Sequence, residues 1–346
     1  MPARVRPRRL TTTKRSKIRI AAECVFKCLG ILEYIFYPAN NRLQVTRHSL
    51  AFDALPKEFD GLRIIQVSDL HGKTFGPGNV RLLDAIRAES PDLILVTGDV
   101  LDERHFFPDQ AREFLKALAE LAPVYYIVGN HEADLREEYR DEVFDAVRES
   151  GVVFLRDEEI VLPRGDAEIL LAGVHDPVFS DPYFETVDMK LQGLDASRMA
   201  ASESGPRVSP ETAALLGLPE SASDANASSA EPRPFRLLLS HRPEGFRLHV
   251  KHGYDLVFCG HAHGGQFRVP LLFPEGLNAP GQGWLPKYTA GTHTEGRTTM
   301  VVSRGLGPSV IPTRLFNRPE LVVCELRSSA AEADGTGTGE ESEKKV

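Results

Sequence analysis

Short apolar runs, each followed by polar residues, alternate with helix-spaced apolar positions through most of the chain. The helix-spaced stretches are residues 80–89 and 110–121. The apolar runs are residues 62–67, 93–96, 124–128, 169–173, 235–239 and 256–259. Runs of this length between helical stretches are typical of buried strands in a parallel-rich sheet with crossover helices. The pattern therefore predicts an α/β fold, in which ligands collect at the carboxyl ends of the strands.

Residue types that bind metals follow five of these predicted strands. They are Asp69 and His71, then Asp99, then Asn130 and His131, then His241, and finally His261 and His263. A single residue of this kind is more often a turn or cap residue than a ligand. Five groups at five strand ends instead favour one shared site. Two neighbouring divalent cations need oxygen and imidazole ligands, together with a carboxylate that bridges them.

Three segments lie outside this alternation. Residues 190–234 are rich in Ala, Ser, Pro and Glu, which predicts a flexible insertion, and an ordinary surface loop is favoured over a lid. Residues 327–346 are rich in Ser, Gly, Thr and Glu, which predicts a disordered tail. Residues 1–40 form a separate N-terminal arm by composition. The catalytic domain is therefore expected to span residues 41–326.

The N-terminal arm is first basic and then apolar. Eight Lys and Arg residues precede the first acidic residue, Glu23, although the whole chain has a formal net charge of −8. Residues 18–37 are apolar, but Arg19, Glu23, Lys27 and Glu33 interrupt them, which argues against a clean transmembrane span. The charged and apolar positions of residues 18–37 instead predict an amphipathic helix on a membrane surface. Packing of that helix onto the enzyme is the alternative. The remaining body is acidic, which argues against a nucleic-acid partner, and four scattered cysteines argue against redox chemistry.

The ordered motifs resemble the signature of the calcineurin-like metallophosphoesterase superfamily. They are Asp69-Leu70-His71, Gly98-Asp99-Val100-Leu101-Asp102, Gly129-Asn130-His131-Glu132, His241, and Gly260-His261-Ala262-His263. The resemblance covers residues 62–326 and implies a four-layer α/β/β/α sandwich with mixed sheets and a metal site at the strand ends. It also implies two divalent metal ions, with manganese as the first choice and iron or zinc as alternatives.

The same resemblance implies a role for each site residue. One ion would be held by Asp69, His71, Asp99 and His263, and the other by Asp99, Asn130, His241 and His261. Asp99 would therefore bridge the two ions, and the bound cations would lower the pKa of a coordinated water. His131 would stabilise the transition state or protonate the leaving oxygen, and Asp102 would orient the His131 imidazole. Glu103 stands where protein phosphatases of this superfamily have arginine, which argues against a protein substrate.

The residues that flank the motifs resemble those of a bacterial membrane-associated subgroup. They are Ser240-His241-Arg242-Pro243-Glu244, His263-Gly264-Gly265-Gln266 and Ser303-Arg304-Gly305-Leu306-Gly307. The subgroup includes pyrophosphatases that act on UDP-2,3-diacylglucosamine in lipid A synthesis. We therefore expect two-metal hydrolysis of a phosphoester or pyrophosphate bond in a lipid-linked substrate, with Arg304 binding the non-reacting phosphate. A phosphodiesterase for cell-wall or soluble nucleotide substrates is the main alternative, and a non-catalytic metal-binding scaffold is the remote one.

The expected partners follow from this reading. They are a phosphorylated lipid or sugar-nucleotide-lipid substrate and a membrane surface, with no nucleic acid and no obligate protein partner. The expected location is the cytoplasmic face of a membrane, as a peripheral protein. A single N-terminal anchor with an extracytoplasmic catalytic domain is the alternative, because a spanning helix with a basic flank would place the body outside.

Overall fold

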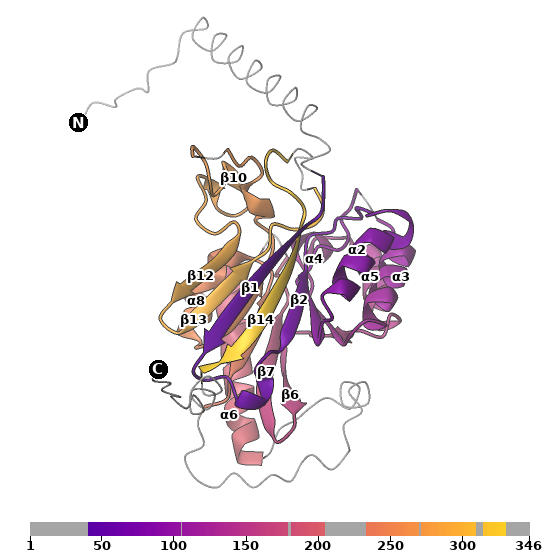
Figure 1. Ribbon diagram of the computed structural model, residues 1–346. Helices are drawn as coiled ribbons and strands as arrows, with labels where there is room; N and C mark the ends of the chain where they lie inside the picture. The colour runs from indigo at the N-terminus through magenta and orange to yellow at the C-terminus, as the bar shows by residue number, and fades with distance from the viewer. Residues whose placement is uncertain are drawn as a thin grey trace, which may run out of the picture.

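Two six-stranded sheets lie face to face, and helices cover the outer face of each (Figure 1). The computed structural model describes residues 41–104, 106–178, 181–204, 233–269, 271–308 and 314–329. The four layers are those expected for the α/β/β/α sandwich. The carboxyl ends of the central parallel strands of both sheets open toward one seam between the sheets.

The first sheet has the strand order β1-β14-β2-β3-β4-β5. Its strands are β1 (Gln44–Phe52), β2 (Arg63–Val67), β3 (Leu93–Val96), β4 (Val124–Tyr126), β5 (Val153–Phe154) and β14 (Glu320–Ser328). β2 to β5 pair in parallel, and β14 pairs antiparallel with β2 but parallel with β1. The sheet is therefore mixed.

The second sheet has the strand order β12-β13-β9-β8-β7-β6. Its strands are β6 (Glu158–Arg164), β7 (Ala167–Val174), β8 (Arg236–Ser240), β9 (Leu256–Cys259), β12 (Gly291–Glu295) and β13 (Thr298–Val302). The four central strands are parallel, and β6 and β12 close the two edges antiparallel. A separate two-stranded ribbon joins β10 (Asn278–Ala279) to β11 (Gly283–Trp284).

The helices divide between the two outer faces. Those associated with the first sheet are α2 (Val80–Ala88), α3 (Pro108–Ala119), α4 (Asn130–Ala133) and α5 (Glu137–Arg148), and those with the second are α6 (Tyr183–Ser204) and α8 (Phe246–Lys251). Short 3-10 turns are η1 (Lys57–Phe59), η2 (Pro77–Asn79), η3 (Pro243–Gly245) and η4 (His263–Gly265).

Three apolar cores hold these layers together, and alternation along each central strand feeds two of them. In β3, Leu95 packs between the sheets, whereas Ile94 packs under the outer helices. In β9, Phe258 packs between the sheets and Val257 faces the outer helices. A strand buried on both faces reads as a continuous apolar run, which explains why these strands stand out in the sequence.

The predicted elements and the observed ones agree closely from residue 62 to residue 178. The helix-spaced residues 80–89 and 110–121 form α2 and α3, and the apolar run at 93–96 is β3. The expected flexible insertion at 190–234 is wrong at its start, because residues 190–204 continue helix α6. Val187, Leu191 and Leu194 anchor this helix on the second sheet, and three alanines in its last turns favour helix formation.

The domain also extends slightly further than expected at its C-terminal end. β14 continues through Ser328, whose hydroxyl donates a hydrogen bond to the Leu55 carbonyl at 2.7 Å. The expected tail therefore begins after this strand. The predicted basic arm at 1–40, the rest of the insertion at 205–232 and the tail from residue 330 lie outside the described residues. Within the described part of the chain, no helix has the length and apolarity needed to cross a bilayer.

Candidate metal centre

Loops that leave five strands carry the expected ligands to the seam between the sheets. Asp69 and His71 follow β2, Asp99 follows β3, Asn130 begins α4 after β4, His241 follows β8, and His261 and His263 follow β9. Six of these seven side chains are buried, and Asn130 is half-buried. The structure thus brings all seven expected ligands into one place.

Five of the ligands have left-handed backbone geometry, which is uncommon for residues other than glycine. Their φ angles are 51° for Asp69, 48° for His71, 56° for Asp99, 63° for His261 and 46° for His263. Each such residue costs about 1–2 kcal/mol relative to ordinary geometry. Backbone hydrogen bonds between loops maintain it, as from the Asp69 N–H to the Gly98 carbonyl at 3.0 Å. The sharp turns direct neighbouring side chains into the seam.

One group of ligand atoms gathers Asp69, His71 and His263. The Nε2 atoms of His71 and His263 are 3.2 Å apart, and Nε2 of His263 is 3.4 Å from Oδ1 of Asp69. Two imidazole nitrogens that bind one cation at about 2.1 Å each lie about 3.0–3.4 Å apart. The observed spacing therefore fits a single cation held between the two rings.

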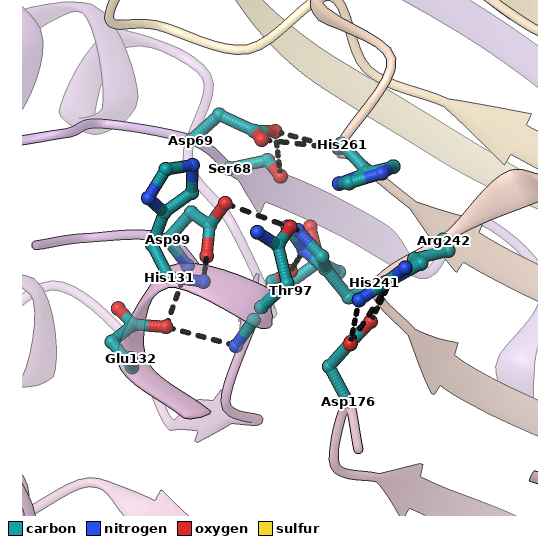
Figure 2. A network of polar contacts seen from close by, with 12 residues as sticks. Ser68, Asp69, Thr97, Asp99, His131, Glu132, Asp176, His241, Arg242 and His261 are labelled. Carbon is teal, nitrogen blue, oxygen red and sulfur yellow. Dashed lines mark hydrogen bonds and ion pairs between the residues drawn. The ribbon is translucent and has the colours of Figure 1, made fainter. Parts of the chain in front are cut away.

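A second group gathers Asp99, His241 and His261 (Figure 2). Asn130 lies alongside this group. Nδ1 of His241 lies 2.7 Å from the Thr97 carbonyl oxygen, so this nitrogen carries the proton and donates it. Nε2 of His241 then lies 3.1 Å from both Oδ2 of Asp99 and Oδ1 of Asn130. Three such acceptor atoms repel one another unless a cation or a proton lies among them.

Asp99 lies between the two groups. Its Oδ2 atom is 3.1 Å from Nε2 of His241 and 3.7 Å from Nε2 of His71. Its other oxygen accepts a 2.9 Å hydrogen bond from the His131 backbone N–H. One carboxylate oxygen is therefore held fixed while the other faces both ligand groups, which is the geometry of a bridging ligand.

The charge states of the ligands suit a cation. Burial alone would raise the pKa of Asp99, but the imidazoles of His241, His131 and His71 hold it well below its usual range. Burial lowers the pKa of His261 and His263 well below the ordinary histidine value, so both rings are neutral and keep a free lone pair. Anionic carboxylate and neutral imidazole are the forms that bind divalent metals.

His241 shows the same demand for positive charge in another way. Burial would lower its pKa, yet the carboxylates of Asp99, Asp69 and Asp176 raise it to about 10. A positive charge is therefore stabilised between His241 and Asp99, and a metal ion supplies it as well as a proton does.

Comparison with known proteins agrees with this donor set. A family model described as calcineurin-like phosphoesterase matches residues 62–265, which is more than half of the chain. The chain belongs to the calcineurin-like phosphoesterase family. Because the family is metal-dependent and the ligands converge as described, the chain is a metal-dependent hydrolase.

Several curated proteins are similar in sequence to this phosphoesterase over most of its length. It is 28% identical over 304 residues to Phosphodiesterase YaeI of Escherichia coli (strain K12), an alignment that covers 85% of this chain and 92% of that protein. It is 24% identical over 302 residues to the uncharacterized metallophosphoesterase YkuE of Bacillus subtilis (strain 168), covering 86% and 90% of the two chains. Among solved structures, Phosphopantetheinyl Hydrolase (PptH) from Mycobacterium tuberculosis aligns with a TM-score of 0.37 and 16% identity, covering 70% and 89%.

Glu132 is a functional residue of this phosphoesterase to which the sequence assigned no role. Its buried carboxylate accepts hydrogen bonds from the backbone N–H groups of Asp99 and Gly129, both at 2.8 Å, and of Val100 at 2.6 Å. It also accepts one from the Tyr126 hydroxyl at 2.8 Å. Glu132 therefore fixes the loop that carries Asp99 against the loop that carries Asn130. The Gly-Asn-His-Glu motif contains this residue, but only the fold shows its contacts.

Glycines allow these two loops to approach each other closely. A Cβ added at Gly129 would lie 2.3 Å from Oδ1 of Asp99, and one added at Gly98 would lie 2.4 Å from the Gly129 nitrogen. Real Cβ atoms do not come this close to other atoms, so larger residues would push the loops apart. Gly98 also has a φ of 91°, which favours glycine independently.

Asp102 contacts a different imidazole from the one expected. The prediction placed it against His131, whereas the structure places Oδ2 of Asp102 3.3 Å from Nδ1 of His71. A carboxylate in this position keeps the proton on Nδ1 and so leaves the Nε2 lone pair of His71 directed at the metal position. Asp102 therefore supports a ligand. The sequence alone does not distinguish the two rings. In the structure they pack against each other, with the His71 and His131 ring centroids 4.8 Å apart.

This contact predicts how an Asp102→Ala variant behaves. We expect its affinity for divalent metal to fall by about 10–100-fold, because partners that orient a ligand typically contribute that much. Titration calorimetry of manganese into metal-depleted protein would measure the change, with Asp84→Ala on the exposed face of α2 as the control. Unchanged metal affinity together with a reduced kcat would instead support the original assignment of Asp102 to His131.

His131 lies at the open side of the centre. Its ring packs edge-on against that of His71, and the residue is half-buried, unlike the six buried ligands. It also forms a group with His71 and Asp99 that is compact enough to contact a cation. Its exposure leaves it accessible to a bound substrate.

Arg304 does not face the centre as a free phosphate-binding group. Its guanidinium donates to Oε1 of Glu320 at 2.8 Å, and its backbone N–H donates to Oε2 of the same carboxylate at 2.9 Å. Arg314 lies closer to the ligands: Nη2 is 3.3 Å from Nδ1 of His263, and Nη1 donates to the Arg304 carbonyl at 2.8 Å. Gly305 beside Arg304 predicted a close approach to an anion. In the structure, the Glu320 carboxylate already balances the charge of Arg304.

An ion pair beside His241 supports the centre (Figure 2). Arg242, the residue after ligand His241, donates from Nε to both oxygens of Asp176, at 3.0 and 2.8 Å. Its guanidinium also lies 4.8 Å from the ring centroid of Tyr183. The pair joins the loops after β7 and β8 and so fixes the backbone beside His241. The sequence alone does not indicate the partner of Asp176 or a role for it.

Proposed function

We propose that this phosphoesterase uses two divalent cations, with manganese as the first choice, to hydrolyse a phosphoester or pyrophosphate bond of a lipid-linked substrate such as UDP-2,3-diacylglucosamine. The position of Asp99 carries the two-cation part of the proposal. Its Oδ2 oxygen faces two ligand groups at once, and each group contains enough donors for one ion. A single-ion site would not need both.

The residues of the chain divide the chemical work. Cations held in the two groups would activate a water and offset the charge of the phosphate. His131, half-buried at the edge of the ligand shell, is placed to donate a proton to the leaving oxygen. Glu132 and Asp102 hold Asp99 and His71 in position, so the charged groups are preorganised before a substrate arrives.

The lipidic substrate is supported by the sequence rather than by the centre itself. Eight Lys and Arg residues precede Glu23, and an apolar stretch at 18–37 follows them, a combination that suits an anionic membrane surface. We place the protein on the cytoplasmic face as a peripheral protein, with an N-terminal anchor and an extracytoplasmic domain as the alternative. The alternative is a phosphodiesterase for cell-wall or soluble nucleotide substrates, and the E. coli relative is named a phosphodiesterase.

A His131→Ala variant tests the function. With manganese present, the wild-type protein should release UMP from UDP-2,3-diacylglucosamine and also cleave a chromogenic phosphodiester. The variant should lose about 10²–10⁴-fold in kcat on both, because it lacks the proton donor. His293→Ala, on edge strand β12, is the matched control and should retain activity.

Each result separates the candidate functions. Cleavage of the diester without UMP release would rule out the lipid A substrate and favour the alternative diesters. Wild-type turnover in the His131→Ala variant would show that His131 is not the proton donor. No turnover of any phosphoester by manganese-loaded wild-type protein would favour the metal-binding scaffold.

A further inference from the structure

Four large apolar side chains project into solvent from the segment that follows the last ligand. Leu271 is 98% exposed, Leu272 70%, Trp284 72% and Leu285 67%. We call these four residues the apolar prong. Single exposed apolar residues are ordinary, but four within fifteen positions are not, and such groups mark interaction surfaces. Trp284 is also the one tryptophan of the whole chain.

The prong is held out by backbone geometry that is unfavourable for leucine. Leu271 has a φ of 70° and Leu285 a φ of 55°, both in the left-handed region. Glycine is the residue that normally occupies such exposed turn positions. Exposed leucines do not stabilise these strained turns in water. Leucine side chains here would contribute favourable free energy only in contact with an apolar environment.

Hydrogen bonds connect the prong firmly to the metal centre. The Leu277 N–H donates to the Gly265 carbonyl at 2.9 Å, and the Leu285 N–H donates to the Leu277 carbonyl at 3.0 Å. Gly265 belongs to η4, which begins with the ligand His263. A Cβ on Gly265 would lie 2.8 Å from the Gly276 Cα, so the backbones at these two glycines are closely packed. The prong therefore has a fixed position relative to the ligands.

The described chain begins at the same end of the molecule. β10 and the start of β1 both lie at the upper end of the sheets in Figure 1. Asn41 accepts a hydrogen bond from Lys73, two residues after ligand His71, at 3.1 Å, and Gln44 donates to the Pro319 carbonyl at 2.9 Å. Residue 41, which follows the basic and then apolar stretch of the sequence, thus lies at the end that carries the prong.

We propose that the apolar prong inserts into the headgroup boundary of an anionic lipid bilayer. The inference rests on the proposed lipid-linked substrate, since insertion would place the centre at the surface where such a substrate lies. Tryptophan and leucine are the residue types that enter this boundary. Lys287 is exposed in the same segment, so a cation at this end complements anionic headgroups.

The single tryptophan makes the test direct. The full-length protein is mixed with vesicles of phosphatidylethanolamine and phosphatidylglycerol, and Trp284 emission is recorded with and without brominated acyl chains. Insertion predicts a blue shift and quenching by the brominated lipid. Leu271→Ser/Leu272→Ser should weaken vesicle partition at least about tenfold, because two exposed leucines lose their apolar contacts. Phe184→Ser/Met189→Ser, on exposed positions of α6, is the matched control and should partition as the wild type does.

Two results would overturn the proposal. Co-sedimentation with vesicles while Trp284 emission stays unshifted would mean that the N-terminal arm binds the membrane without the prong. A blue shift that requires no vesicles, or that rises with protein concentration, would mean that this chain or a second copy covers the prong.

Turnover separates the prong from the proposed substrate. The Leu271→Ser/Leu272→Ser variant should cleave a water-soluble phosphodiester at the wild-type rate and lose activity only on vesicle-borne UDP-2,3-diacylglucosamine. If Trp284 inserts but the wild-type protein leaves that lipid intact, the prong stands and the proposed substrate fails. If the lipid is cleaved equally by wild type and variant, the substrate stands and the prong fails.

Discussion

An Asp99→Ala variant is expected to turn over phosphodiester at least about 10³-fold more slowly than the wild type. In the wild type, Oδ2 of Asp99 faces both ligand groups, so one substitution weakens two cation positions. Each cation supplies several kcal/mol of charge stabilisation in the transition state, and 1.36 kcal/mol corresponds to a tenfold change in rate. Asp99 is thus expected to have a larger effect than any ligand that faces one group alone.

Metal content distinguishes this mechanism from general loss of structure. Plasma mass spectrometry of protein dialysed against limiting manganese should give about two ions per wild-type chain and fewer than one per Asp99→Ala chain. Circular dichroism should show the same secondary structure in both. Two retained ions in an inactive Asp99→Ala variant would contradict the bridging role.

A Glu132→Gln variant is expected to lose about 2–4 kcal/mol of unfolding free energy. The carboxylate accepts hydrogen bonds from three backbone N–H groups and the Tyr126 hydroxyl in a fully buried position. An amide turns one acceptor into a donor, which then faces donors, and each buried donor left without a partner costs about 1–3 kcal/mol. Equilibrium urea denaturation of metal-free protein measures the loss without a contribution from bound cations.

Position decides the size of this effect, so a matched substitution on the surface should do little. Glu120→Gln, exposed at the end of α3, should change the unfolding free energy by less than about 0.5 kcal/mol. If Glu132→Gln proved equally neutral, the loop of Asp99 would not depend on Glu132.

The fold and the grouping of the expected ligands could be predicted from the sequence for the same physical reason. Strands such as β3, buried on both faces, must be continuous apolar runs, and the polar residue that follows each run marks the strand end. Because parallel strand ends meet at one edge, residues such as Asp69 and Asp99 were expected together, and the structure brings them together. α6 was missed because Ala and Ser dominate its later turns and blur the apolar spacing.

The errors concern contacts between residues that are far apart in the sequence or placed between two candidates. Arg304 pairs with Glu320, sixteen positions away, and nothing local announces that pair. Asp102 contacts His71, whose ring packs against that of His131, so choosing between the two rings requires coordinates. Glu132 binds backbone N–H groups, which every residue has, so no pattern of side chains could have revealed its partners.

The position of β14 affects when the enzyme can become active during its synthesis. β14 is the last described strand of the chain, yet it lies between β1 and β2 and pairs with both. β2 leads directly to ligands Asp69 and His71, so this side of the centre lacks its neighbour until the ribosome has made Ser328. Domains generally fold as units once their strands are complete. All the expected ligands are thus translated before the sheet that positions them can close, so metal capture by the complete centre must follow synthesis of β14.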